Sequence, residues 1–304
     1  MKSILDVNHV TKKYSSKTAI DDVSFSVPEG EIFGLLGPNG AGKTTMIRMI
    51  NQITMPDSGE ILFNGEQLGE QHISSVGYLP EERGLYKKMK VGEVALYLAE
   101  LKGMKGIKAK QQLDYWFEKF EIKDWWNKKV EELSKGMQQK VQFITTVMHE
   151  PKLLIFDEPF SGFDPLNANL LKQEILSFKK KGATIIFSTH NMASVEEICD
   201  RIVLINNAKN ILSGEVKEIK QQFKLGEYEI VTTSSEIEPL LVSGVELLKK
   251  EEGLDSLTTS IVKIPQGRHA DLLSSILTKT DIVSYKEILP TMNEIFIKTV
   301  KSYR

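Results

Sequence analysis

The segment from Gly37 to Thr44 constrains the fold of this 304-residue chain more than any other feature. It fits the pattern GxxxxGK(S/T) and lies between an apolar run, Ile32–Leu36, expected to be a buried strand, and a helix expected to begin near Thr44. Backbone N–H groups at a helix N-terminus bind anions, and glycines let the backbone curl closely around phosphates. The sequence therefore predicts a strand–loop–helix unit that binds a nucleoside triphosphate.

Two side chains of this loop have specific expected tasks. Lys43 should reach the β- and γ-phosphates, and the Thr44 hydroxyl should ligate Mg²⁺. The loop thus predicts ATP and Mg²⁺ as ligands. The residues predicted to bind ATP here are Gly37, Pro38, Asn39, Gly40, Ala41, Gly42, Lys43, Thr44 and Thr45.

A second apolar run ends in two carboxylates. Residues Leu153–Phe156 have the pattern of a buried strand, and Asp157 and Glu158 follow directly. Because the carboxyl ends of parallel strands meet at one sheet edge, both carboxylates should lie beside the phosphate loop. We expect Asp157 to hold Mg²⁺ and Glu158 to orient and deprotonate the attacking water. Alone, an apolar run before Asp-Glu is better explained as a surface loop; beside a phosphate loop it indicates hydrolysis.

Strand patterns alternate with helical ones along residues 1–222. Half-buried strands are expected at the N-terminus, and residues 85–150 have a helical pattern and contain all three tryptophans, which should form a local core. Strands that alternate with helices favour a parallel sheet covered on both faces. We therefore predict an α/β fold with a mostly parallel sheet, an antiparallel N-terminal β subdomain and a helical subdomain. The further strands expected are Ile4–Val10, Asp22–Val27, Ser58–Asn64, Thr184–Phe187 and Ile202–Ile205.

The pattern changes after Gln222. Its order of strand, helix, strand, strand, helix and strand predicts a small α+β accessory domain over residues 223–304, built as a split β-α-β unit. This part contains no phosphate loop or metal-like cluster, so we expect it to take no part in the chemistry. The expected strands are Tyr228–Thr232, Val245–Leu248, Ser260–Ile264 and Ile282–Tyr285, and the expected helices are Glu236–Val242, His269–Leu277 and one from Pro290.

Composition narrows the class of protein. The chain is 41% hydrophobic and 26% charged, as in ordinary globular domains, and its formal charge of −2 predicts no attraction to nucleic acid. The single cysteine, Cys199, allows no internal disulfide and fits a reducing compartment. No window approaches the roughly 20 apolar residues that cross a bilayer as a helix. Any membrane span should therefore belong to another chain.

A third segment carries a resemblance to a known family. Leu133–Gln138 reads Leu-Ser-Lys-Gly-Met-Gln, similar to the Leu-Ser-Gly-Gly-Gln signature of ATP-binding-cassette (ABC) ATPases. The resemblance implies a P-loop NTPase fold in which the signature contacts the γ-phosphate held by the opposite subunit. Without it, the segment would be only a helix cap. The signature residues, which should act in trans, are Ser134, Lys135, Gly136, Met137 and Gln138, of which Lys135 and Met137 depart from the usual pattern.

Other elements of the family follow in the expected order. The resemblance implies that the Tyr14 ring stacks on adenine and that His190 touches the γ-phosphate as a second catalytic residue. Ser161 and Asp164 match the loop that contacts the facing subunit. Glu81 stands where the family has a glutamine that contacts magnesium, and it should still ligate the metal or accept a hydrogen bond from its water. Residues 81–86 and the accessory domain resemble those of bacterial sodium-efflux and multidrug-type exporter ATPases, and this resemblance suggests that the domain regulates or strengthens dimer contacts.

This resemblance implies partners and a place in the cell. We expect two copies, or a pair of related subunits, to form a head-to-tail dimer that drives a separate transmembrane permease on the cytoplasmic face of the membrane. The alternative is a soluble mechanical ATPase of DNA repair, chromosome maintenance or translation. However, the short separation of Lys43 from Ser134 leaves no room for a long coiled coil, and the chain has one cassette. A small-molecule kinase would not explain the signature.

Overall fold

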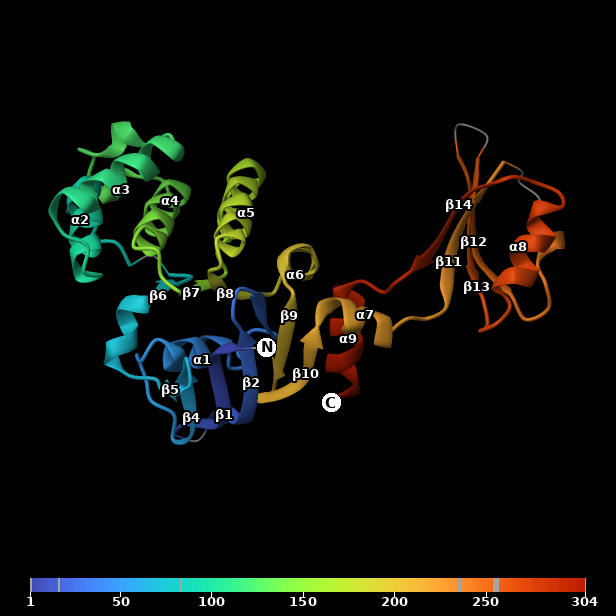
Figure 1. Cartoon of the computed structure of the whole chain (residues 1–304), viewed down its shortest axis with the longest axis horizontal. Helices are drawn as coiled ribbons and strands as arrows, with labels where there is room; N and C mark the ends of the chain where they lie inside the picture. Colours follow the sequence, from blue (N-terminus) through green and yellow to red (C-terminus); the bar gives the residue numbers. More distant parts are fainter. Residues whose placement is uncertain (1, 16, 83, 234–236, 254–256, 304) are drawn as a thin grey trace. The chain divides into compact units, whose positions relative to one another are not determined.

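The computed structural model describes residues 2–15, 17–82, 84–233, 237–253 and 257–303 (Figure 1). The chain divides into two compact units. The first extends to Val216 and also takes in Tyr303, and the second spans Lys217–Ser302. The predicted boundary between residues 222 and 223 lies a few residues further along the chain than this division.

The first unit is built on a six-stranded sheet with strand order β10-β9-β3-β8-β7-β6, in which β9, β3, β8, β7 and β6 run parallel and β10 is antiparallel to β9. Every residue of β3, β7 and β8 is buried, as expected for strands covered on both faces. The mostly parallel sheet is therefore confirmed. Its strands are β3 (Ile32–Leu36), β6 (Val76–Leu79), β7 (Leu153–Asp157), β8 (Thr184–Thr189), β9 (Arg201–Asn206) and β10 (Lys209–Glu215).

An antiparallel sheet of order β2-β1-β4-β5 forms the N-terminal β subdomain. Its inward residues, such as Leu5, Val10 and Val23, share one apolar core with Met46 and Ile47 of helix α1. The helix that follows the phosphate loop is thus packed between two sheets, which fixes its N-terminus. The elements are β1 (Ser3–Tyr14), β2 (Lys17–Pro28), β4 (Ser58–Phe63), β5 (Glu66–Gln67) and α1 (Lys43–Ile50).

The predicted helical stretch contains three α-helices. Trp116 on α3 is 5% exposed and stacks on Phe178 with ring centroids 5.8 Å apart, whereas Trp125 and Trp126 are half-buried. The tryptophan core is therefore centred on Trp116. Helices of the first unit are α2 (Val91–Leu101), α3 (Gly106–Lys119), α4 (Lys135–Val147), α5 (Pro165–Lys180) and α6 (Met192–Ile198), with 3-10 turns at Glu70–Ser75, Lys123–Trp125 and Val130–Glu132.

The second unit is an antiparallel sheet of order β12-β13-β11-β14. Its apolar core includes Ile230, Val262, Leu272 and Ile276, which join the sheet to helix α8. The small α+β fold is confirmed, but the first expected helix is reduced to a 3-10 turn at Glu238–Leu240; Glu236 lies outside the described residues. The elements are α7 (Val216–Gln222), β11 (Glu227–Thr232), β12 (Glu246–Glu252), β13 (Thr258–Lys263), α8 (His269–Leu277), β14 (Ile282–Ile288) and α9 (Met292–Ser302).

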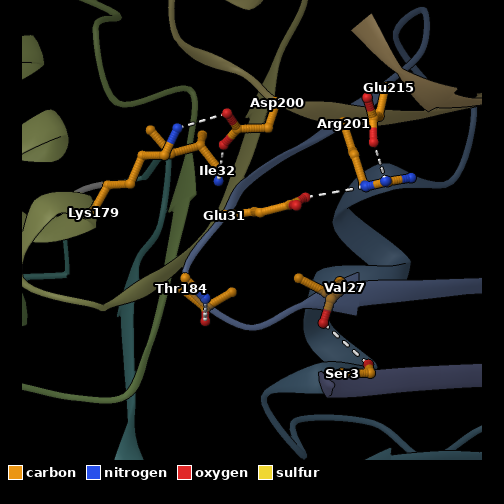
Figure 2. A network of polar contacts seen from close by, with 10 residues as sticks. Ser3, Val27, Glu31, Ile32, Lys179, Thr184, Asp200, Arg201 and Glu215 are labelled. Atoms are coloured by element: carbon orange, nitrogen blue, oxygen red, sulfur yellow. Dashed lines mark hydrogen bonds and ion pairs between the residues drawn. The ribbon is translucent and has the colours of Figure 1, made fainter. Parts of the chain in front are cut away.

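A polar network ties the amino ends of the central strands together (Figure 2). Asp200 accepts from the backbone N–H of Ile32 at 2.8 Å and from Lys179 at 2.6 Å. Arg201 pairs with Glu31 at 3.2 Å and also with Glu215. Burial raises the pKa of Glu31, and the charge of Arg201 opposes that rise. These contacts hold the start of β3 against β9. The phosphate loop and the carboxylates lie at the opposite edge of the sheet, where β3 and β7 end.

Candidate nucleotide site

Glycines are required in the phosphate loop by the chain's own packing. Gly37 has φ +150° and Gly42 has φ +119°, in the region that L side chains rarely adopt. A Cβ atom on Gly37 would lie 2.2 Å from the carbonyl oxygen of Ile205, and one on Gly42 would lie 2.4 Å from that of Ala19. The loop can therefore approach its neighbours this closely only with glycine at both positions.

Lys43, the first residue of α1, curls back into the loop. Its Nζ donates to the carbonyl oxygens of Gly37 at 2.7 Å and Pro38 at 3.2 Å, and the residue is 8% exposed. Burial lowers the pKa of Lys43, while the charges of Glu158 and Asp157 raise it. A cation held in this way, with two carboxylates nearby, is suited to pair with the phosphates of a nucleotide.

Asp157 ends strand β7 and is 3% exposed. Burial raises the pKa of its carboxyl group, the charges of Glu81 and Glu158 raise it further, and Lys43 opposes the rise. A buried carboxylate beside other carboxylates is stabilised by a cation. No group of three or more His, Cys, Asp or Glu that could hold a metal occurs in the described part of the chain. Mg²⁺, however, uses one or two carboxylates together with phosphates and water, so Asp157, Glu81 and the Thr44 hydroxyl fit it as a donor set.

Glu158 is held in an unusual backbone conformation. Its φ is +48°, which costs about 1–3 kcal/mol for a residue other than glycine. Its backbone N–H donates to the carbonyl of Ser188 at 2.9 Å, which fixes the residue beside the end of β8. Its Oε1 lies 2.6 Å from Nδ1 of His190 and accepts from the His190 backbone N–H at 2.9 Å. The two residues predicted to be catalytic therefore contact each other directly.

The loop and the carboxylates meet around one cavity of about 330 Å³. The 45% exposed side chain of Tyr14 lines it, which leaves the ring available for an adenine base. Lys17 and Ala19, from the start of β2, also line it and were not predicted as site residues. The lining consists of Tyr14, Lys17, Ala19, Asn39, Gly40, Gly42, Lys43, Thr44, Thr45, Glu81, Asp157, Glu158 and His190.

Three predicted loop residues do not line this cavity. Gly37 and Pro38 face Lys43 through their carbonyl oxygens, and the Ala41 N–H donates to the Pro38 carbonyl at 3.2 Å. Ala41 is buried, at 4% exposure, in the core shared with α1. These residues shape the loop from behind, while the others face the cavity.

The signature segment lies outside the cavity lining. Ser134 is the N-cap of α4, where its hydroxyl accepts from the Met137 N–H at 3.3 Å, and Gln138 donates to the Leu133 carbonyl at 2.9 Å. Ser134 and Lys135 are exposed. Within one chain the segment is thus a capped helix start that does not contact its own nucleotide site.

The loop after Glu158 is also separate from the cavity. The Asp164 carboxylate caps α5 by accepting from the N–H groups of Leu166 at 3.0 Å and Asn167 at 3.1 Å. Hydrogen bonds from Asn167 lower the pKa of Asp164. The Ser161 N–H donates to the Glu158 carbonyl at 3.0 Å, and its side chain is exposed. Among the described residues, neither Ser161 nor Asp164 lines the cavity.

Known proteins match almost the whole of this chain. It is 41% identical over 297 residues to the uncharacterized ABC transporter ATP-binding protein YhaQ of Bacillus subtilis, covering 98% of each chain. The chain belongs to the ABC transporter ATP-binding proteins. The family described as ABC transporter matches residues 20–161, and the family described as ATP-binding protein DrrA1-3-like, C-terminal domain, matches residues 214–300.

Two further comparisons agree with this assignment. The linearmycin resistance ATP-binding protein LnrL of Bacillus subtilis is 28% identical over 303 residues, with 97% of each chain covered. A solved structure described as the ATP-binding subunit of an ABC transporter superposes with a TM-score of 0.69 at 33% identity, over 73% of this chain and 93% of that one.

The family assignment fixes the activity. As an ABC transporter ATP-binding subunit, this chain binds ATP and hydrolyses it to drive transport, and subunits of this kind dimerise and work with transmembrane permeases. Within the described ranges, no helix has the length and apolar character needed to cross a membrane.

Proposed function

We propose that this subunit powers an exporter, with Mg²⁺-bound ATP in the cavity around Lys43 and a separate permease at the cytoplasmic face of the membrane. The name of the relative LnrL, a resistance protein, supports the direction of transport. The accessory domain over residues 223–304 would support dimer contacts without entering the chemistry, since the cavity lining comes from the first unit.

The proposed chemistry rests on the observation that Glu158 and Lys43 line the same cavity. Lys43 and the loop N–H groups bind the phosphates, and the carboxylate of Glu158 accepts the proton of the attacking water. His190, whose ring contacts Glu158, would orient that carboxylate and contact the γ-phosphate. Held by Thr44, Glu81 and Asp157, Mg²⁺ would neutralise charge on the phosphates.

A partner subunit is proposed to complete each site. Ser134 and Lys135 are exposed at the start of α4 and away from their own cavity, as a contact made in trans requires. Ser161 and Asp164 would border the same contact. Two copies arranged head to tail, or this chain with a related subunit, would bury two ATP molecules between them.

An exposed apolar groove supports contact with a permease. The side chains of Ile53 and Leu101 are 61% and 63% exposed, and both line a groove of about 360 Å³ together with Leu85 and Leu98. Exposed apolar patches of this kind mark protein contacts. We propose that a cytoplasmic segment of the permease occupies it.

Replacement of the proposed base tests the chemistry. Glu158→Gln should keep ATP affinity and reduce hydrolysis on the order of 10²-fold or more, because an amide cannot accept the proton. The variant should also dimerise more stably with ATP. Glu82→Gln, a nearby exposed carboxylate that does not line the cavity, is the control and should keep the wild-type rate. A wild-type rate in Glu158→Gln would show that Glu158 is not the base.

A further inference from the structure

The two carboxylate oxygens of Glu158 have different partners. Oε1 receives the His190 backbone N–H and lies beside its ring, while Oε2 accepts from the Thr189 hydroxyl at 3.1 Å. The His190 side chain is 69% exposed, whereas Thr189 is 3% exposed. The ring contact at Oε1 can therefore change when ligand enters and expose that oxygen, which the backbone N–H of His190 still holds, whereas the contact at Oε2 is enclosed by protein.

The Thr189 hydroxyl has a fixed direction. It accepts from the Asn191 backbone N–H at 3.1 Å, and Asn191 in turn caps α6 by accepting from Ala193 at 3.0 Å and Ser194 at 3.2 Å. Because the Asn191 N–H occupies the acceptor side of the hydroxyl, its proton is free to be donated to Glu158. The start of α6 thus orients the hydroxyl, and the hydroxyl orients the carboxylate.

Both the backbone and the side chain of Glu158 are held by neighbouring groups. With φ at +48°, the residue occupies a conformation that persists only when surrounding contacts hold it. The Ser188 carbonyl fixes its backbone N–H, and the contacts from Thr189 and His190 hold its carboxylate. A base must hold its oxygen within hydrogen-bond reach of the water it deprotonates.

We propose that Thr189 is a positioning residue that fixes Oε2 of Glu158 and leaves Oε1 as the oxygen that accepts the water's proton. The proposal rests on the proposed role of Glu158 as the base. Thr189 does not line the nucleotide cavity, so it would act on the rate through the orientation of the carboxylate.

Isosteric removal of the hydroxyl tests this role. Thr189→Val should lower kcat about tenfold while the KM for ATP and the directly measured ATP affinity stay near wild type, since a misplaced base affects the chemical step alone. Thr189→Ser, which keeps the hydroxyl, should restore kcat to within about twofold. If valine prevents folding, Thr189→Ala removes the hydroxyl without branching and is compared with serine in the same way.

Thr184→Val is the matched control. Thr184 lies on the same strand β8, is fully buried, and its hydroxyl also accepts a backbone N–H, that of Gly30 at 2.8 Å, but at the opposite end of the strand. It should lose stability as Thr189→Val does and keep kcat. An equal fall of kcat in both variants, or a wild-type kcat in a folded Thr189→Val, would overturn the proposal.

A double variant separates this inference from the proposed function. If Glu158→Gln is inactive, adding Thr189→Val should cause no further loss, because the oriented group is already gone. A further loss would mean that Thr189 acts elsewhere. If Glu158→Gln is fully active, the proposed base is wrong; if it is inactive while Thr189→Val is normal, only the positioning role is wrong.

Discussion

The phosphate loop and the signature segment both place backbone N–H groups at the start of a helix, yet they are built differently. At α1, Gly37 and Gly42 are required because a side chain would meet the chain's own backbone. At α4, Gly136 has no such constraint: an added Cβ would lie 3.7 Å from the Gly162 carbonyl oxygen, an ordinary contact. Packing within one chain therefore explains Gly37 and Gly42, whereas no contact of this kind requires glycine at position 136, which fits the proposed contact with the nucleotide of a facing subunit.

The two helix starts also differ in how far they are buried and in what surrounds them. Lys43 is 8% exposed and shares a cavity with Asp157 and Glu158, while Ser134 is exposed and its hydroxyl is occupied with capping its own helix. The start of α1 is therefore part of a preformed site, whereas the start of α4 lies on the surface. This contrast is what a site shared between two chains would require of each of them.

Replacement of Lys43 should give the largest effect. Lys43→Ala removes the cation that is expected to pair with the phosphates, so ATP affinity should fall by roughly 10²-fold or more, with turnover falling alongside it. Calorimetric titration with ATP measures the affinity, and Lys13→Ala, an exposed lysine outside the cavity lining, is the control. Unchanged ATP affinity in Lys43→Ala would contradict the assignment of the loop.

Mixing two inactive variants tests the contrast directly. A bulky residue at Ser134 should spare ATP binding by the monomer but block the shared site. If each site takes its loop from one chain and its signature from the other, a mixed dimer with a Lys43→Ala chain has one site with both defects and one with neither. Random pairing of identical subunits should then restore roughly a quarter of the wild-type sites. ATPase activity of the mixture measures this, and activity no greater than the sum of the separate variants would contradict a shared site.

Much of the fold could be predicted because its strands are buried and its helices amphipathic. Strand β3 and helix α8 have the predicted bounds, Ile32–Leu36 and His269–Leu277. Strand β6 was missed: it has four residues, one of them Gly77, and its neighbour β7 rather than its own pattern stabilises it. The expected helix at 236–242 is a 3-10 turn over Glu238–Leu240, where the proline cannot supply a helix-interior N–H.

The residues of the site also divide into those that the sequence predicted and those that it missed. The loop and the carboxylates were found because each follows a buried strand, and parallel strands bring their carboxyl ends together. Lys17 and Ala19 were missed because they reach the cavity through the pairing of β1 with β2 and through the close approach of Ala19 to Gly42, which are tertiary contacts. The only sequence signal for Lys17 was a cation close after Tyr14, and such a cation is common in any hairpin.

Alanine at Gly136 should give the smallest of these effects, and its comparison with alanine at Gly42 should give the sharpest contrast between the two helix starts. Gly136→Ala lies in the first turn of α4 with ordinary space around it, so the monomer should be unchanged or up to about 1 kcal/mol more stable, since alanine favours helices over glycine. Gly42→Ala should destabilise the fold, because its φ of +119° and the Ala19 carbonyl both exclude a side chain.

Thermal or urea unfolding of the two variants, followed by circular dichroism without nucleotide, measures this difference. The ATPase rate supplies the second half of the test: Gly136→Ala should keep ATP affinity yet lower turnover about tenfold, a loss of about 1.4 kcal/mol in the transition state. If Gly136→Ala instead destabilises the monomer as Gly42→Ala does, the glycine is needed by its own chain. The inference that it is reserved for the nucleotide of a facing subunit would then lose its physical basis.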